Sequence, residues 1–234
     1  MTEETRSNEG RALTVRNIAV AVLVFGSLWG VAEVVLNDAI RAADLPFRAG
    51  ALTGFGMLAM GLLLGYGRKP VAILGVPVVA VLVKQMVVPI LGASVLCKAN
   101  SCIAVLFEAA VLAGVAGIAT RGINKSAIMR AGAGAGAGLA AAVPFYFVGL
   151  AVAPCAYLMS FDRAGGLAAF MVQEGLVWAA FSAVLFPIGY ALGARVREPM
   201  RAFEMRSPIA YYGAALGVAV SCWITAAIAI YAGA

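Results

Sequence analysis

The sequence predicts an all-α protein, a polytopic transmembrane helix bundle, and its composition and hydropathy pattern carry that prediction. Of the 234 residues, 63% are hydrophobic and 12% are charged, whereas soluble domains average roughly 45–50% apolar and about 25% charged residues. Seven apolar stretches are each long enough to cross about 30 Å of hydrocarbon as a helix. They are continuously apolar rather than alternating, which favours helices over a β-barrel. The stretches are residues 17–36, 49–67, 71–92, 103–120, 133–160, 168–194 and 208–232.

Sequence signals bound each stretch in turn. The first follows a polar tail, residues 1–16, and is expected to remain as a helix because no clear cleavage site of small residues follows it. The fifth has the least defined start, since residues 131–138 alternate Ala and Gly, which favours close packing at the expense of helix propensity. Prolines lie within or near the ends of spans, where they kink helices: Pro77, Pro89, Pro144, Pro154 and Pro187. Residues 17–197 are thus expected to form the six-helix core of a single transmembrane domain, to which residues 208–232 add a seventh helix.

Composition also excludes several classes of protein. No stretch is long enough for a separate soluble domain of about 100 residues, which excludes a stand-alone soluble enzyme or nucleic-acid-binding domain. The net charge of +6 is typical of basic cytoplasmic loops in a membrane chain. Histidine is absent, which removes the commonest proton shuttle, haem ligand and zinc ligand. No positioned nucleophile or cofactor motif is visible, so we expect no enzymatic activity, no cofactor and no metal.

Basic residues divide unequally between alternate loops. Twelve lie in the N-terminal tail and in the loops after the second, fourth and sixth stretches, whereas four lie on the opposite side and one, Lys84, lies inside a span. Cytoplasmic loops carry the excess of Lys and Arg. The sequence therefore predicts a multi-pass protein of the cell (inner) membrane with a cytoplasmic N-terminus and, after seven spans, an extracytoplasmic C-terminus.

Four ionisable side chains lie within predicted spans: Glu33, Lys84, Glu108 and Glu174. Insertion scales give about 2.5–3.5 kcal/mol for a charge at a helix centre, so such groups normally face a cavity or a partner. Counted from the cytoplasmic anchors at 1.5 Å per residue, all four lie about 20–32 Å from the inner face. We therefore expect them to converge on one outward-facing site with a net charge near −2 when all four are ionised.

Polar and aromatic neighbours complete the candidate substrate-binding set. Gln85, Asn100 and Gln173 lie near these charges in the sequence. Trp29 lies one turn before Glu33 on the same helical face. An aromatic wall beside carboxylates suits a flat or cationic organic ligand.

Structural alternatives remain open for these residues. In one, Lys84 pairs with a single glutamate to hold helices together and the other carboxylates snorkel toward the outer headgroups. In another, Trp29 packs in the core or anchors at the membrane interface. Desolvation that keeps one or two glutamates protonated would make the site nearly neutral and weaken its preference for cations.

Two of the four cysteines lie close together in the predicted outer loop before the fourth stretch. Cys97 and Cys102 are five residues apart, so a local disulfide and two free thiols are equally compatible with the sequence. Two close thiols without a histidine or a second pair do not supply the four ligands of a structural zinc or an iron–sulfur cluster. Cys155 and Cys222 fit small core positions.

Three runs of residues resemble the substrate-binding S components of energy-coupling factor transporters: Phe25 to Glu33 (FGSLWGVAE), Leu45 to Gly50 (LPFRAG) and Asn100 to Glu108 (NSCIAVLFE). The resemblance covers about residues 16–197 and implies a six-helix membrane protein that binds a vitamin or metal-type nutrient from outside. It further implies a separate membrane coupling subunit and two ATPases as partners. The ligand would lie in the outward half of the bundle near the four charged side chains, and residues 37–48 would form a lid.

Two features differ from that family. Residues 208–232 are additional to its six helices, and Gly26-xxx-Gly30 stands where many S components carry the Ala-xxx-Ala pattern that docks on the coupling subunit. Three functions therefore remain open. The first is a subunit for uptake of a small, vitamin-like or cationic nutrient, and the second is a non-catalytic anchor of a larger membrane complex. The third is an ion or proton pathway through the membrane carboxylates.

Overall fold

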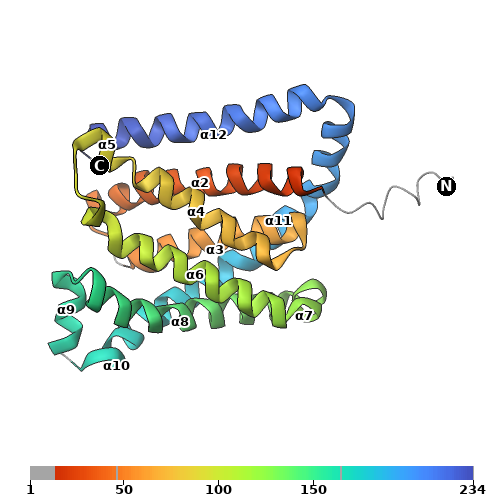
Figure 1. The fold of residues 1–234 in the computed structure, drawn as a ribbon. Coiled ribbons are helices and arrows are strands. Elements are labelled where there is room, and N and C mark those ends of the chain that lie inside the picture. Colours follow the sequence, from red (N-terminus) through yellow and green to blue (C-terminus); the bar gives the residue numbers. More distant parts are fainter. Residues whose placement is uncertain (1–13, 46, 164, 234) are drawn as a thin grey trace.

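The described residues form an all-α bundle with seven helical segments long and apolar enough to cross a membrane, as the sequence predicts (Figure 1). The structure, a computed structural model, describes residues 14–45, 47–163 and 165–233. The tail predicted over residues 1–16 lies outside the described residues up to residue 13. The spans are Val15–Ala42, Arg48–Gly67, Pro70–Leu91, Val95–Ile118, Ala127–Val152, Gly166–Arg206 and Pro208–Tyr231.

Helices α2 (Val15–Ala42), α3 (Arg48–Gly67) and α6 (Ala99–Ile118) are continuous. Helix α2 runs past the expected end at residue 36 because its polar last turns, which include Asn37 and Arg41, continue the helix beyond the apolar stretch. Thr14 caps its start by accepting a hydrogen bond from the backbone N–H of Asn17 (3.3 Å), which satisfies one of the free amides of the first turn.

The third span is interrupted, and a proline explains where. It consists of the 3₁₀ turn η1 (Pro70–Leu74), α4 (Gly75–Lys84) and α5 (Val87–Leu91). Pro89 has no N–H to donate to the carbonyl of Gln85, and its ring clashes with that carbonyl in a regular helix. The α-helix therefore ends at Lys84, one residue before the carbonyl that Pro89 leaves without its helical donor.

The fifth span begins and ends earlier than the expected residues 133–160. Helix α8 (Ala127–Val152) starts after Ser126, whose hydroxyl accepts from the N–H of Met129 (3.4 Å). The Ala-Gly alternation, residues 131–138, lies wholly within this helix. Its Gly134 and Gly138 let α8 approach the backbone of the sixth span closely, which favours the helix despite their low helix propensity. Pro154 follows the end of α8, and the chain continues as the short helix α9 (Ala156–Arg163).

The sixth span is longer than the expected residues 168–194. It comprises α10 (Gly166–Phe170), a π-helical segment labelled η3 (Met171–Gly175) and α11 (Leu176–Arg206). The described chain then turns at Ser207 into α12 (Pro208–Tyr231). The charged last turns of α11 thus extend the helix beyond its apolar part.

Helix α3 lies at the centre of the bundle and packs most extensively on α11. The contact is a crossing of glycines, in which Gly61-xxx-Gly65 of α3 meets Gly189-xxx-Gly193 of α11. A Cβ added at Gly61 would lie 2.6 Å from the carbonyl oxygen of Phe186, and one at Gly193 would overlap the backbone of α3. Close backbone approach of this kind is the usual role of small-xxx-small patterns in membranes.

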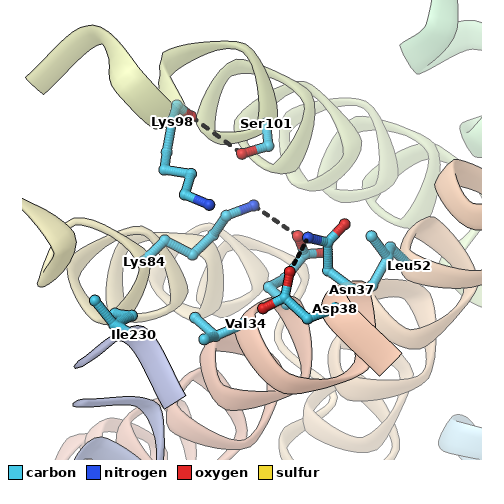
Figure 2. A pocket seen from close by; sticks show the side chains of 9 residues that line it. Val34, Asn37, Asp38, Leu52, Lys84, Lys98, Ser101 and Ile230 are labelled. Atoms are coloured by element: carbon cyan, nitrogen blue, oxygen red, sulfur yellow. Dashed lines mark hydrogen bonds and ion pairs between the residues drawn. The ribbon is translucent and has the colours of Figure 1, made fainter. Parts of the chain in front are cut away.

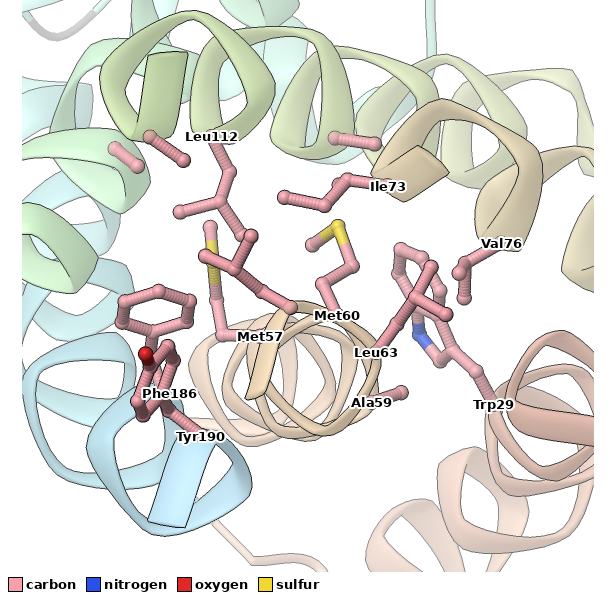
Figure 3. Packing of buried hydrophobic residues seen from close by; sticks show 14 of the residues in the cluster. Trp29, Met57, Ala59, Met60, Leu63, Ile73, Val76, Leu112, Phe186 and Tyr190 are labelled. Carbon is pink, nitrogen blue, oxygen red and sulfur yellow. The ribbon is translucent and has the colours of Figure 1, made fainter. Parts of the chain in front are cut away.

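The main core surrounds α3 (Figure 3). Met57, Met60 and Leu63 of α3 contact Leu112 of α6 and Trp29 of α2, all of them almost completely buried. These apolar contacts set the positions of the helices that carry the membrane charges.

The other glycine pattern of the sequence, Gly26-xxx-Gly30, is also used inside the chain. A Cβ at Gly26 would lie 2.6 Å from Cβ of Val79, and a Cβ at Gly30 would lie 2.6 Å from Cβ of Val83, both on α4. Helix α12 also packs on α2, where Trp223 donates to Ser27, and it lies at the edge of the bundle (Figure 1). It is the least buried of the described spans.

Candidate functional site

A cavity of about 230 Å³ lies where several helices end on one side of the bundle. The last turns of α2, the first turns of α3 and α6, the end of α8 and the π-helical segment η3 all contribute to its wall. Glu33, Glu108 and Glu174 line it. The structure thus brings together three of the four charges predicted for the site.

The fourth charge, Lys84, lies directly behind this cavity and is paired with Glu33. Its Nζ atom lies 2.6 Å from Oε2 of Glu33, and the two side chains are 4% and 6% exposed. The indole N–H of Trp29 donates to the other carboxylate oxygen (3.2 Å). Both oxygens of Glu33 therefore have partners, and the pair is nearly neutral as a unit.

A smaller cavity of about 70 Å³ adjoins the first and shares Glu33 and Asn37 with it. Figure 2 shows that Lys84 and Lys98 reach into this space from two sides, with Asp38 opposite. The four charged side chains predicted from the sequence thus border two adjoining cavities rather than one.

Glu108 lies in the middle of α6 and is 3% exposed. Its Oε1 atom accepts a hydrogen bond from the hydroxyl of Thr53 on α3 (2.9 Å), and its Oε2 atom has no hydrogen-bond partner. A buried carboxyl with one free oxygen is costly unless something else binds it. Glu108 is therefore the strongest single indication of a ligand in the cavity.

Glu174 projects from the π-helical segment η3. Such segments are rare and occur frequently at functional sites. The hydroxyl of Tyr157, on α9, donates to Oε1 of Glu174, and Oε2 has no partner. Desolvation and this hydrogen bond raise the pKa of Tyr157 above its usual value, so the hydroxyl keeps its proton at neutral pH and remains a donor.

The polar neighbours predicted for the site separate into two groups. Asn100 lines the cavity, where its amide N–H donates to Sγ of Cys155 (3.1 Å) and its Oδ1 atom has no partner. Gln85 does not line the cavity, because its amide is directed to the carbonyl of Val95 (3.3 Å). Gln173 is exposed and does not line it either.

Trp29 does not form the aromatic wall of the cavity. It is completely buried, because the missing side chain of Gly56 leaves a slot that the indole fills. Besides Tyr157, three aromatic residues of the described chain line the cavity instead: Phe145, Phe170 and Trp178. Their ring centroids lie 5.3 to 6.4 Å apart.

The sequence reasoning missed these aromatic residues, and it placed Arg48 only in the expected lid and not among the residues that line the cavity. Trp178 follows Glu174 by four residues, the same spacing that pointed to Trp29 and Glu33, so this signal was present. Arg48 lines the cavity as well. Its positive charge brings the expected net charge of the site from near −2 to near −1 when all groups are ionised.

The two cysteines predicted as a possible disulfide are free thiols in the structure. Cys97 is exposed in the 3₁₀ turn η2 (Val95–Lys98), whereas Cys102 is buried on α6, where its Sγ atom accepts from Gln85 Nε2 (3.5 Å). The opposite burial of the two thiols explains why they do not meet. In the described part of the chain, no cluster of three or more Cys, Asp and Glu side chains is placed to hold a metal ion.

Comparisons with protein-family models, with curated proteins and with solved structures find no match to this chain. The fold and the site together define a multi-pass helical membrane protein with a charged cavity. Function is therefore argued from the cavity itself.

Proposed function

We propose that the chain is a membrane-embedded substrate-binding subunit for uptake of a small nutrient, vitamin-like or cationic, that works with a separate coupling subunit and separate ATPases. The observation that carries the proposal is the cavity, since carboxylates from three segments of an apolar bundle line it and two of them keep an oxygen without a partner. Polar groups convergent on a concave, partly aromatic pocket are the usual form of a small-molecule site. The resemblance to S components in residues 16–197 supports the same function.

The proposed orientation agrees with the position of the cavity. Its lining comes from the end of the first span, the starts of the second and fourth and the end of the fifth, which all belong to the side predicted to be extracytoplasmic from the basic residues. A nutrient would then enter from outside. Asn37 and Arg48, at the two ends of the proposed lid, both line the cavity.

The docking surface for a coupling subunit is not expected at Gly26 and Gly30. These positions are covered by α4 of the same chain, so a partner would have to bind another face. Open glycine positions exist on α6 and α8, for example Gly117 and Gly132, where an added Cβ would meet nothing within 4 Å.

One observation favours the second candidate function, an anchor subunit of a larger membrane complex. Helix α12 is the least buried of the described spans, and Gly213 and Gly217 on it have open space around them. A small-residue face of this kind suits a partner helix. The third candidate, a proton pathway, is less well supported because no hydrogen bond joins Glu33, Glu108 and Glu174 to one another among the described residues.

Purification from the native membrane tests the proposal directly. The full chain is isolated in a mild detergent, and mass spectrometry identifies the proteins and small molecules that accompany it. A membrane coupling subunit with an ATPase pair supports the uptake function, whereas subunits of another enzyme support the anchor function.

The same purification, carried out with the Glu108→Gln variant, distinguishes binding of a ligand from binding of partner proteins. This variant is expected to lose a co-purifying small molecule while keeping its protein partners, since only the cavity changes. Glu198→Gln is the matched control, because Glu198 is 69% exposed and lies outside the cavity. A small molecule that accompanies both variants equally would contradict a role for the cavity.

A further inference from the structure

Most of the polar atoms around the cavity that lack a hydrogen-bond partner are acceptors rather than donors. Among the residues that the structure describes, four that line the cavity hold a buried side-chain atom without a hydrogen-bond partner: Asn100 Oδ1, Glu108 Oε2, Glu174 Oε2 and Trp178 Nε1. With both glutamates ionised, three of these atoms accept hydrogen bonds and one donates. Buried groups of this sort normally have hydrogen-bond partners in native proteins. A ligand that completes this cavity would therefore supply mainly hydrogen-bond donors.

The charges around the cavity give the same result. Glu33 contributes little to a ligand, because Lys84 and Trp29 occupy both of its oxygens. Arg48 can balance one of the two remaining carboxylates. A single positive charge on the ligand would complete the balance when all groups are ionised.

The apolar part of the wall complements these acceptors. Phe145, Phe170 and Trp178 form a triangular cluster in the cavity wall, with ring centroids 5.3 to 6.4 Å apart. Aromatic rings stack with flat apolar groups and attract cations through their faces. A bare inorganic cation would leave this wall and the Trp178 N–H unused.

We infer that the ligand is a compact organic cation with a flat ring body and a terminal ammonium or amidinium group rich in N–H donors. The inference rests on the proposed function and narrows it to one substrate chemistry. The donor group binds the free oxygens of Glu108, Glu174 and Asn100. The ring packs against the aromatic wall, where Trp178 Nε1 donates to an acceptor on the ligand. Bonds from an ionised donor to a carboxylate are about twice as strong as neutral ones, so the charged end decides the specificity.

Three compounds with the same indole body and different end groups test this chemistry on the unaltered full chain. They are tryptamine (an ammonium), tryptophol (a neutral hydroxyl) and indole-3-acetate (a carboxylate), and isothermal titration calorimetry in detergent at neutral pH measures their affinities. Tryptamine is expected to bind about tenfold or more tightly than tryptophol, and indole-3-acetate more weakly than both, since charge-assisted bonds and the acidic wall favour the cation.

A pair of variants assigns the preference to the cavity. Glu108→Gln is expected to weaken tryptamine binding about tenfold and to change tryptophol binding less than about twofold, because the amide keeps the size of the side chain and removes its charge. Glu198→Gln, on the exposed part of α11, is expected to leave all three affinities unchanged.

The possible results distinguish this inference from the function on which it rests. If indole-3-acetate or tryptophol binds as tightly as tryptamine or more tightly, the inference of a cationic ligand is wrong, whether or not Glu108 contributes. The proposed function as a substrate-binding subunit would still hold. The absence of binding by all three compounds would overturn both. Preference for tryptamine that survives Glu108→Gln would overturn the assigned contact.

Discussion

Replacement of Lys84 by Met is expected to destabilise the protein, because it removes one partner of a buried ion pair. Lys84 and Glu33 lie 2.6 Å apart and are almost completely buried. Methionine is apolar and similar in length, so the change mainly deletes the charge and the N–H donors. Glu33 then keeps only the N–H of Trp29. Loss of one partner of a buried pair costs about 3–5 kcal/mol, since the remaining charge is left uncompensated.

The double variant Glu33→Gln, Lys84→Met provides an internal control. Glutamine removes the second charge and keeps an amide oxygen that can accept from Trp29. Replacement of a whole buried pair by neutral groups is often neutral or stabilising. The free energy of unfolding of the double variant is therefore expected to lie within about 1 kcal/mol of that of the unaltered protein. The double-mutant cycle built on Glu33→Gln and Lys84→Met is expected to give a coupling energy of about 2 kcal/mol or more.

The free energy of unfolding is measured by titration of the purified protein in mixed micelles with a denaturing detergent, followed by tryptophan fluorescence. Trp29 is bonded to the pair and reports its loss. The reasoning is refuted if Lys84→Met alone changes the free energy of unfolding by less than about 1 kcal/mol, or if the double variant is as unstable as the single one.

Four further outcomes are expected. Gly193→Ala, whose added Cβ would overlap the α3 backbone, should lower the free energy of unfolding by about 1–3 kcal/mol, whereas Gly136→Ala, which meets nothing within 4 Å, should raise it by about 0.5–1 kcal/mol in the same titration. Ser27→Ala, which removes the 3.0 Å hydrogen bond from Trp223, should cost about 0.5–1.5 kcal/mol, and a change near zero would mean that this bond does not help to hold α12 on α2. A cysteine added after Ala234 should react with an impermeant maleimide in intact cells, and reaction only after the membrane is opened would reverse the proposed orientation.

Sequence reasoning identified most of the charged residues of the site, because a charge in an apolar span stands out against its surroundings. Glu33, Glu108 and Glu174 each had to be explained by a cavity or a partner, and all three line the cavity. The sequence could not show which of them takes Lys84, since the pair joins α2 and α4 across 51 positions. Pairing of that kind depends on helix packing, which the spacing of charges does not encode.

The aromatic wall could not be predicted from the sequence, because its residues do not stand out from the apolar residues around them. Phe145 and Phe170 are apolar residues in an apolar chain, and nothing in their spacing separates a cavity wall from lipid contact. The glycine patterns raised a similar difficulty. The Gly61-xxx-Gly65 pattern is visible in the sequence, but its partner, α11, was decided by tertiary packing. The interruption at Gln85 could have been located in advance, because Pro89 lies four residues later.

The glycine crossing between α3 and α11 also has a mechanical consequence. With no side chain between the two backbones at Gly61 and Gly193, α3 and α11 cannot slide or tilt against each other without a steric clash, and they behave as one rigid unit. Thr53 belongs to α3 in this unit, and Glu174 belongs to the π-helical segment that continues into α11. Admission of the proposed ligand would therefore depend on short elements at the rim, such as α9, which packs on α8 and α10 and meets η3 through the Tyr157–Glu174 hydrogen bond.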